Sequence, residues 1–213
     1  NDLPMAIVTI LLKSGASADP PDQTGVSNIV AKMLTRGTRD YSAEELAQAL
    51  DFLGTSLSIS AGTDFTTITL TTLSRNIDAS FALLAQVVLY PTFPDHEFLR
   101  IKKEVLGGIR SHEEDPGWVA AKTFRERLFT GLPYGHLVTG DPATVKNISL
   151  RDVINYHSSH YFPKNAIIAV AGNTTTEQTL ALLAQHMDDW KPAPAPSIKW
   201  PIHTATRAQE ILI

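Results

Sequence analysis

Two threonine-rich segments joined by a four-residue turn restrict the fold more than any other part of the sequence. Residues 56–60 and 65–73 alternate apolar and polar side chains, and only residues 61–64, Ala-Gly-Thr-Asp, separate them. This arrangement predicts two antiparallel strands. Residues 6–13 and 166–171 are apolar runs rich in β-branched side chains, which predicts two further, buried strands. We therefore expect a largely antiparallel β-sheet.

Helical patterns fill the rest of the chain. Capping boxes predict helix starts at Ser42 and Ser149, and residues 77–89 are apolar on nearly every side, as in a core helix. The adjacent Gly107 and Gly108 suggest close backbone packing or a kink, because each costs about 1 kcal/mol relative to alanine inside a helix. The expected helices cover residues 25–34, 42–53, 77–89, 95–114, 118–129, 149–160 and 176–187. The predicted fold class is α+β, a mixed and largely antiparallel sheet packed with helices.

Composition excludes several classes of protein. The 213 residues are 43% hydrophobic and 19% charged, as in an ordinary globular protein. The net charge of −4 argues against a nucleic-acid partner. No apolar run approaches the roughly 20 residues of a transmembrane helix. The chain has no cysteine, which excludes thiolate metal sites and thiol redox chemistry.

A Pro-Ala-Pro-Ala-Pro run predicts the domain boundary. We expect residues 1–190 to form a single domain, residues 191–206 to form an extended linker, and residues 207–213 to begin a further domain. No signal-peptide pattern opens the sequence. We expect the chain to be part of a longer protein.

One helical segment carries the frame of a zinc-binding motif without its ligands. Residues 25–38 read Gly-Val-Ser-Asn-Ile-Val-Ala-Lys-Met-Leu-Thr-Arg-Gly-Thr. They resemble the signature of the insulinase/pitrilysin family of metallopeptidases, Gly-Leu-x-His-x-x-Glu-His-Met-x-x-x-Gly-Thr. The matching frame residues are Gly25, Met33, Gly37 and Thr38. The zinc-binding histidines of the family fall on Asn28 and Lys32, and its catalytic glutamate falls on Ala31.

These replacements remove the chemistry of the motif. Two imidazoles four residues apart on a helix can share a zinc ion, and a carboxylate between them can take a proton from the bound water. Asn28 is a weak zinc donor, Ala31 cannot accept a proton, and Lys32 places an ammonium where the metal would lie. We therefore expect no zinc and no other cofactor in this domain.

The third zinc ligand of the family is also replaced. The family carries Glu-x-x-Val-Val-x-x-Glu-Ile on a later helix, and the matching run here is Ile-Lys-Lys-Glu-Val-Leu-Gly-Gly-Ile at residues 101–109. The ligand falls on Gly108, and its supporting glutamate falls on Ile101. Glu104 lies one turn before Gly108, so we hypothesise that it pairs with Lys32. A solvated Glu104 is the alternative, because exposed ion pairs contribute only about 0–1 kcal/mol.

A third block extends the resemblance over nearly the whole chain. Residues 131–142, Gly-Leu-Pro-Tyr-Gly-His-Leu-Val-Thr-Gly-Asp-Pro, are similar to a loop of the family, and residues 161–172 are similar to the strand that follows it. Full family members consist of two similar halves that face one another like a clam shell. The resemblance implies that this chain is the first half.

The resemblance also implies a surface for peptide binding. In family peptidases the substrate adds as a strand to a sheet edge, and by position the matching residues are Phe65, Thr67, Ile68 and Thr69. Backbone pairing does not require the metal. The alternative is that these residues belong to an ordinary strand of the core sheet.

Other candidate residues lack the context of a site. His157 and His160 share a helix face without an evident third ligand, and residues 112–114, His-Glu-Glu, are typical of a solvated helix end. Trp118, Trp190 and Trp200 are expected to be packing or linker residues. No nucleophile elbow, Walker motif or dinucleotide-binding glycine pattern is present.

The resemblance favours a catalytically inactive homologue of a zinc peptidase. The first hypothesis is a non-catalytic subunit that pairs with an active, zinc-bearing homologous subunit, or with the second half of its own chain, and helps to form a chamber that holds peptide. The alternatives are a scaffold subunit without peptide handling and an active peptidase with a relocated metal site. Bacterial family members imply a periplasmic location.

Overall fold

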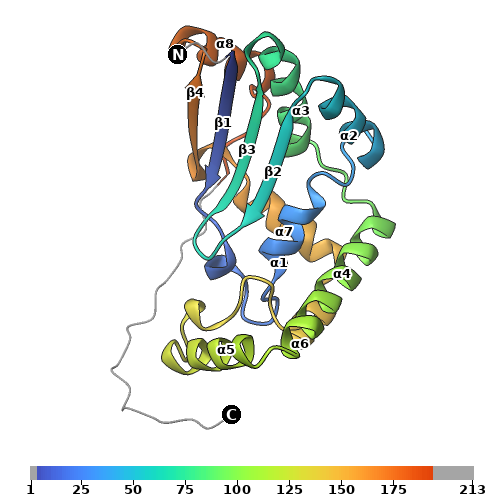
Figure 1. Ribbon diagram of the computed structural model, residues 1–213, viewed down its shortest axis with the longest axis vertical. Coiled ribbons are helices and arrows are strands. Elements are labelled where there is room, and N and C mark those ends of the chain that lie inside the picture. Colours follow the sequence, from blue (N-terminus) through green and yellow to red (C-terminus); the bar gives the residue numbers. More distant parts are fainter. Residues whose placement is uncertain (1–3, 194–213) are drawn as a thin grey trace.

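The described part of the chain forms a four-stranded antiparallel sheet. The computed structural model describes residues 4–193. The strands are β1 (Met5–Leu12), β2 (Ser56–Ala61), β3 (Thr66–Leu73) and β4 (Ala166–Gly172), in the spatial order β2-β3-β1-β4 (Figure 1). The predicted antiparallel sheet and the β2–β3 hairpin are confirmed.

One face of the sheet forms the core. Side chains that lie opposite one another across the four strands make rows on this face that are apolar except for Thr66. From β2 to β4 these rows are Leu57, Leu70, Val8 and Val170; Ile59, Ile68, Ile10 and Ile168; and Ala61, Thr66, Leu12 and Ala166. On the two central strands these residues are fully buried. The sheet is thus anchored by β1 and β3 and becomes more accessible at its two edges.

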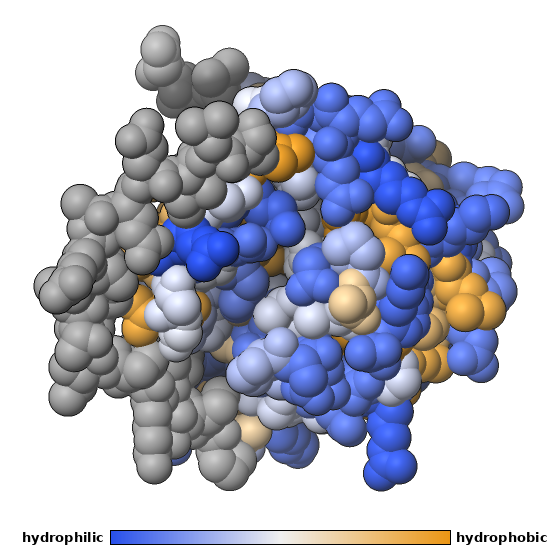
Figure 2. Space-filling view, turned by 90° about the horizontal axis from the view of Figure 1, so that it is seen from below, coloured by the Kyte–Doolittle hydropathy of each residue, from blue (hydrophilic) through white to orange (hydrophobic). Residues whose placement is uncertain are grey.

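Helices cover the buried face of the sheet and extend below it (Figure 1). They are α1 (Val26–Met33), α2 (Ala43–Phe52), α3 (Ile77–Leu89), α4 (Asp95–Glu113), α5 (Pro116–Leu128), α6 (Pro142–Asn147), α7 (Leu150–His160) and α8 (Thr176–His186). Short 3₁₀ turns are η1 (Ala16–Ala18), η2 (Ser74–Asn76), η3 (Pro133–Gly135) and η4 (Pro163–Asn165). Seen from below, the surface is mostly hydrophilic, and its hydrophobic residues form separate patches (Figure 2).

Most helix predictions are confirmed, including both capping boxes. Ser42 accepts the N–H of Glu45, whose side chain in turn accepts the N–H of Ser42, and Ser149 and Asp152 repeat this arrangement. Helix α3 is buried on several sides, as its composition predicts. The short helix α6 was not predicted, although Asp141 followed by proline is a typical helix start.

The prediction of close packing at the paired glycines is wrong. Helix α4 continues through Gly107 and Gly108, and both glycines are exposed. A Cβ atom at either position would meet no other atom within 4 Å. No neighbouring backbone therefore requires glycine here.

Two strand predictions also need correction. Strand β4 was predicted to be buried, but it is an edge strand with alternate residues exposed, and Ile167 is 50% exposed. The residues proposed as a peptide-binding edge, Phe65, Thr67, Ile68 and Thr69, do not lie at an edge. Strand β3 pairs with β1 on one side and with β2 on the other, so its backbone groups are already used.

The proposed linker and second domain fall almost entirely outside the described residues. Of residues 191–206 the structure describes only the first three, and it describes none of residues 207–213. The boundary near residue 190 stays a prediction. Within residues 4–193, no helix has both the length and the apolar character to cross a membrane.

A close crossing fixes the start of α1. Gly25 adopts a φ of 100° directly before the helix, and Gly140 adopts a φ of 71° in the loop that passes over it. A Cβ atom on Gly140 would collide with the carbonyl oxygen of Thr24. Only glycine combines this backbone conformation with such a close approach.

Gly140→Ala should therefore destabilise the protein more than a glycine replacement without the contact. Gly131 is the matched control, because its φ is 75° and a Cβ there would meet nothing within 4 Å. We expect Gly131→Ala to cost about 1 kcal/mol of unfolding free energy from backbone strain, and Gly140→Ala to cost at least about 2–3 kcal/mol. Urea unfolding of both variants measures this difference. Equal losses would show that the crossing does not constrain Gly140.

Candidate functional site

A buried carboxylate positions the helix that carries the degenerate motif. Asp19 Oδ2 accepts the N–H of Gly25 at 2.7 Å, and Oδ1 accepts the N–H of Ser27 at 3.2 Å. These N–H groups belong to the first turn of α1, where they have no partner within the helix. Burial raises the pKa of Asp19 to about 7, although the two donors act in the opposite direction. Asp19 is thus a buried cap with a strongly perturbed pKa.

The motif positions on α1 divide between core and surface. Ala31, at the position of the catalytic glutamate, is only 3% exposed. On α4, Ile101 is fully buried at the position of the supporting glutamate. Both positions are now apolar packing sites. A carboxylate at either one would be costly to bury without a partner.

The ion pair between Lys32 and Glu104 is confirmed. Lys32 Nζ lies 3.0 Å from Glu104 Oε1, and Arg100 Nη1 lies 3.9 Å from Glu104 Oε2. The hydrogen bond from Lys32 lowers the pKa of Glu104. The two paired side chains are 39% and 49% exposed, so the pair stabilises the fold by only about 0–1 kcal/mol. Its main effect is to hold a cation where the family places a zinc ligand.

The two remaining motif positions also provide no metal ligand of the kind the family uses. Asn28 is partly buried, and the described residues provide no hydrogen-bond partner for its Nδ2. Gly108 is exposed on α4 and has no side chain. Among residues 4–193, no group of three His, Cys, Asp or Glu side chains is placed to hold a metal ion. The donor set around α1 does not fit zinc.

The histidines considered as ligands have structural roles. His157 Nε2 lies 3.0 Å from the carbonyl oxygen of Val88, and burial lowers the pKa of His157 to about 4. His160 stacks on Tyr156 with ring centroids 4.0 Å apart. His112 stacks on Trp118 at 5.7 Å. The packing prediction for Trp118 is confirmed.

Trp190 also packs as predicted, because its indole N–H donates to the carbonyl oxygen of Tyr161 at 2.9 Å. Trp200 lies outside the described residues.

The edge strand beside the motif is β2. Helix α1 packs against β2, which, among residues 4–193, has a neighbouring strand on one side only. At the hairpin turn, the N–H of Gly62 donates to the carbonyl oxygen of Phe65 at 2.7 Å. Hydrogen-bonded and non-hydrogen-bonded pairs alternate along an antiparallel ladder. The N–H and C=O groups of Leu57, Ile59 and Ala61 therefore point outward, away from β3.

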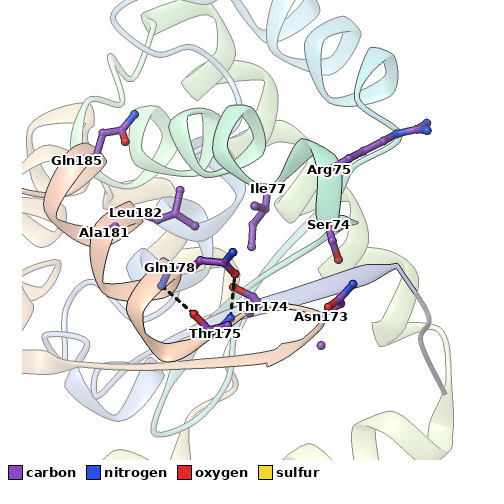
Figure 3. A pocket seen from close by; sticks show the side chains of 11 residues that line it. Ser74, Arg75, Ile77, Asn173, Thr174, Thr175, Gln178, Ala181, Leu182 and Gln185 are labelled. Carbon is purple, nitrogen blue, oxygen red and sulfur yellow. Dashed lines mark hydrogen bonds between the residues drawn. The ribbon is translucent and has the colours of Figure 1, made fainter.

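A cleft of about 660 Å³ lies near the start of α8, and none of its described lining residues is His, Asp, Glu or Lys. Gln178 and Thr175 use their polar groups to cap α8, and the side chain of Arg75 extends away from the hollow (Figure 3). No charged side chain drawn there points inward (Figure 3). We assign no site to this cleft.

Asp19 is the important residue that the sequence did not reveal. It lies in a turn-rich stretch, Asp-Pro-Pro-Asp, and its partners begin six residues later. An acidic residue before a helix is a recognisable capping signal. Its burial, however, depends on contacts between distant segments.

Two family models match the chain. Residues 2–136 match the insulinase family, peptidase family M16, and residues 147–212 match the peptidase M16 inactive domain. The first match alone covers more than half of the sequence.

Curated relatives resemble the chain at low identity. A non-peptidase homolog, YmxG, from Helicobacter pylori is 24% identical over 85% of this chain and 42% of its own length. Zinc protease PqqE from the same organism is 25% identical over 94% of this chain and 46% of its own length. The chain therefore spans less than half the length of these relatives.

Solved structures share the fold. A peptidase M16 inactive domain from Pseudomonas fluorescens superposes with a TM-score of 0.87 and 28% identity, covering 92% of this chain and 48% of that one. The periplasmic protease PqqL from Escherichia coli has a TM-score of 0.84 at 17% identity, covering 94% and 23% of the two chains. The α+β fold class is confirmed.

Two buried groups should give opposite pH dependences of stability. The pKa of Asp19 is about 7 in the folded protein and 3.8 ordinarily, so its stabilising contribution is complete below pH 3.8 and is lost as the pH rises through 7. The pKa of His157 falls from 6.5 to about 4, so its contribution is complete above pH 6.5 and is lost as the pH falls through 4. Each group alone contributes a slope of up to about 1.4 kcal/mol per pH unit.

Burial also lowers the pKa of His160, so His160 acts in the same direction as His157. From about pH 5 to about pH 6.5 the unfolding free energy of Asp19→Asn should therefore rise, and that of the double variant His157→Gln/His160→Gln should fall. The parent protein should show a flatter profile than either variant, because its two slopes oppose one another. Urea unfolding across this interval measures all three profiles. If the unfolding free energies of the parent and the variants changed with pH in parallel, the assigned pKa values would be wrong.

Proposed function

Since the chain belongs to the insulinase family of peptidases, family M16, we propose that it is a non-catalytic member that helps to form a peptide-binding chamber. This proposal rests on what occupies the motif positions in the structure. Lys32 is in an ion pair, and Ala31 and Ile101 are packed in the core. No general base remains at the motif, so this domain neither holds zinc nor activates water for hydrolysis.

The edge of β2 is the feature that supports peptide binding. Its outward backbone groups can pair with an extended chain without help from a metal. The side chains of Ser56, Ser58 and Ser60 are exposed on the open face of the sheet, so they leave the edge unobstructed. We place the peptide on β2 rather than on β3, where the sequence first suggested it.

The open face of the sheet supports association with a further unit. Met5 and Ile7 lie on this face near the start of β1 and are 38% and 43% exposed, and Ile167, which is 50% exposed, lies on the same face opposite Leu11, toward the other end of β1. The curated relatives are more than twice as long as this chain. The partner we propose is an active zinc-bearing homologous subunit or the second half of the same protein. The periplasm is the proposed location, by analogy with PqqL.

Affinity purification of the full-length protein from its native cells tests the subunit role. We expect a stoichiometric partner with an intact His-x-x-Glu-His motif, identified by mass spectrometry. Such a partner would assign peptide cleavage to the pair. Recovery of the full-length protein alone would leave the second half of the same protein as the partner and contradict a separate subunit. Recovery within a membrane complex that lacks any peptidase motif would favour a scaffold role and contradict the proposal.

A proline on β2 should weaken peptide binding. Ile59→Pro removes an outward N–H while leaving the pairing with β3 intact. Ile168→Pro is the matched control, because Ile168 lies in the same row on the opposite edge and its N–H also points outward. Both residues are partly buried against the core, so the two variants should lose similar stability.

Binding of fluorescein-labelled, carboxymethylated casein to the full-length protein provides the measurement. We expect Ile59→Pro to weaken binding by about tenfold. The variant loses the hydrogen bond from the Ile59 N–H to the peptide, and a carbonyl oxygen of the peptide is then left without a donor. Ile168→Pro should bind like the parent protein. Equal binding by both variants, or no binding by the parent, would contradict a peptide site on β2.

A further inference from the structure

The turn that contains Asp19 connects η1 to α1. The carboxyl group of Asp19 accepts the N–H groups of Gly25 and Ser27 at 2.7 and 3.2 Å. Within the described residues, these two N–H groups have no other acceptor. Asp19 itself is only 7% exposed. The first turn of α1 is therefore held by one buried carboxyl group.

The preceding 3₁₀ turn, η1, is fixed to the β2–β3 hairpin. The N–H groups of Ala16 and Ser17 donate to the carbonyl oxygens of Gly62 and Thr63 at 2.9 and 2.8 Å. A Cβ atom on Gly15 would lie 2.5 Å from the carbonyl oxygen of Gly62, so the two backbones are in close contact. Because η1 directly precedes the turn, a shift of the turn is transmitted to the hairpin.

The interior around this carboxyl group is polar but provides no cation. The hydroxyl of Ser27 hydrogen-bonds to the carboxylate and, like the two N–H donors, lowers the pKa of Asp19. Tyr156 and Tyr161 lie near enough for a charge on Asp19 to raise their own pKa values. Burial outweighs all three donors and raises the pKa of Asp19 to about 7, since a buried carboxylate without a cation is costly.

A cleft of about 540 Å³ provides solvent access to Asp19. It lies between the segment that leads into α1 and a wall formed by α5 and η3. An ionised Asp19 gains hydration by shifting toward this cleft, which takes it away from the N–H groups of α1. The groups that face it are Tyr156 and Tyr161 in the interior, and Glu126, His136 and Asp141 along the cleft.

None of these described groups is a lysine or an arginine, so no permanent cation holds the carboxylate in place. In η3, Tyr134 is engaged by Asp64 of the hairpin, with 2.9 Å between Oη and Oδ1. Glu126 and Asp141 carry the same sign of charge as an ionised Asp19 and disfavour it further.

We propose that Asp19 is a pH-sensitive latch that fastens the start of α1 to the β2–β3 hairpin. With its proton, the carboxyl group remains buried and keeps both N–H groups. Without its proton, the turn opens toward the cleft and loosens η1 on the hairpin. The hairpin ends strand β2, so a pH-dependent order of the peptide edge rests on the proposed function, whereas the latch does not.

The sign of the effect follows from the two states. The closed state has the raised pKa of about 7, and the open, hydrated state has the ordinary value of 3.8. The closed state therefore binds the proton more tightly. The latch is strongest below pH 3.8 and weakens as the pH rises through 7.

Backbone hydrogen exchange of the full chain, followed by NMR, tests the latch. After correction for the intrinsic rate, the protection of the Gly25 and Ser27 N–H groups should fall by up to about tenfold per pH unit from about pH 4 to about pH 7, and then level off. Ala16 and Ser17 should follow them, because η1 loosens with the turn. Ile10 is the reference, since it is fully buried in the central strand β1 and exchanges through global unfolding.

Two results would overturn the proposal. One is protection of Gly25 and Ser27 that changes with pH only as that of Ile10 does. The other is a change at Gly25 and Ser27 that leaves Ala16 and Ser17 unaffected, because the carboxyl group would then titrate without loosening the hairpin.

Two variants separate Asp19 from its surroundings. Asp19→Asn keeps the size of the side chain but does not titrate, so the protection of Ser27 should lose its own pH dependence. Asp22→Asn is the matched control, because Asp22 lies in the same turn but is exposed, and it should behave like the parent protein. A pH dependence that persists in Asp19→Asn would contradict the latch.

A direct titration guards against misfolding of the Asp19→Asn variant. The carboxyl carbon of Asp19 in the parent protein, observed by carbon-13 NMR, should titrate with a midpoint near 7. A midpoint near the ordinary value of 3.8 would overturn the proposal, because the closed state would then have no preference for the proton.

Discussion

The anchoring of α1 determines the arrangement of the rest of the candidate site. The carboxyl group of Asp19 accepts the first two free N–H groups, Gly25 provides the turn into the helix, and Gly140 crosses it at close range. From this fixed start the buried face of α1 packs into the core, and its opposite face presents Lys32 to α4. The same geometry would position zinc ligands in an active relative. Here it positions an alanine in the core and a lysine in an ion pair.

The proposed loss of the metal and the proposed peptide edge on β2 are physically independent. Zinc chemistry requires particular side chains, so substitutions at a few positions remove it. Strand addition uses backbone groups, which substitutions of side chains leave in place. Strand β2 therefore keeps its outward N–H and C=O groups although its neighbour α1 carries no ligand. This separation explains how a chain can keep the fold of a peptidase family as a binding component.

Local signals in the sequence predicted most of the secondary structure, because capping boxes and alternating side chains act over a few residues. Ser42 and Ser149 start their helices as expected. The order of the strands could not be predicted in this way, since it depends on pairing between distant segments. For that reason β3 was mistaken for an edge, and β4 was mistaken for a buried strand. The burial of Asp19 and the cleft beside it likewise arise from tertiary contacts.

The zinc content of the full-length protein tests the central claim most directly. The protein would be equilibrated with excess zinc, freed of unbound metal and analysed by inductively coupled plasma mass spectrometry, alongside an Asn28→Ala variant. The account predicts that both proteins hold the same amount of zinc, because this domain contributes no site. One equivalent of zinc that is bound by the parent and lost in the Asn28→Ala variant would contradict it.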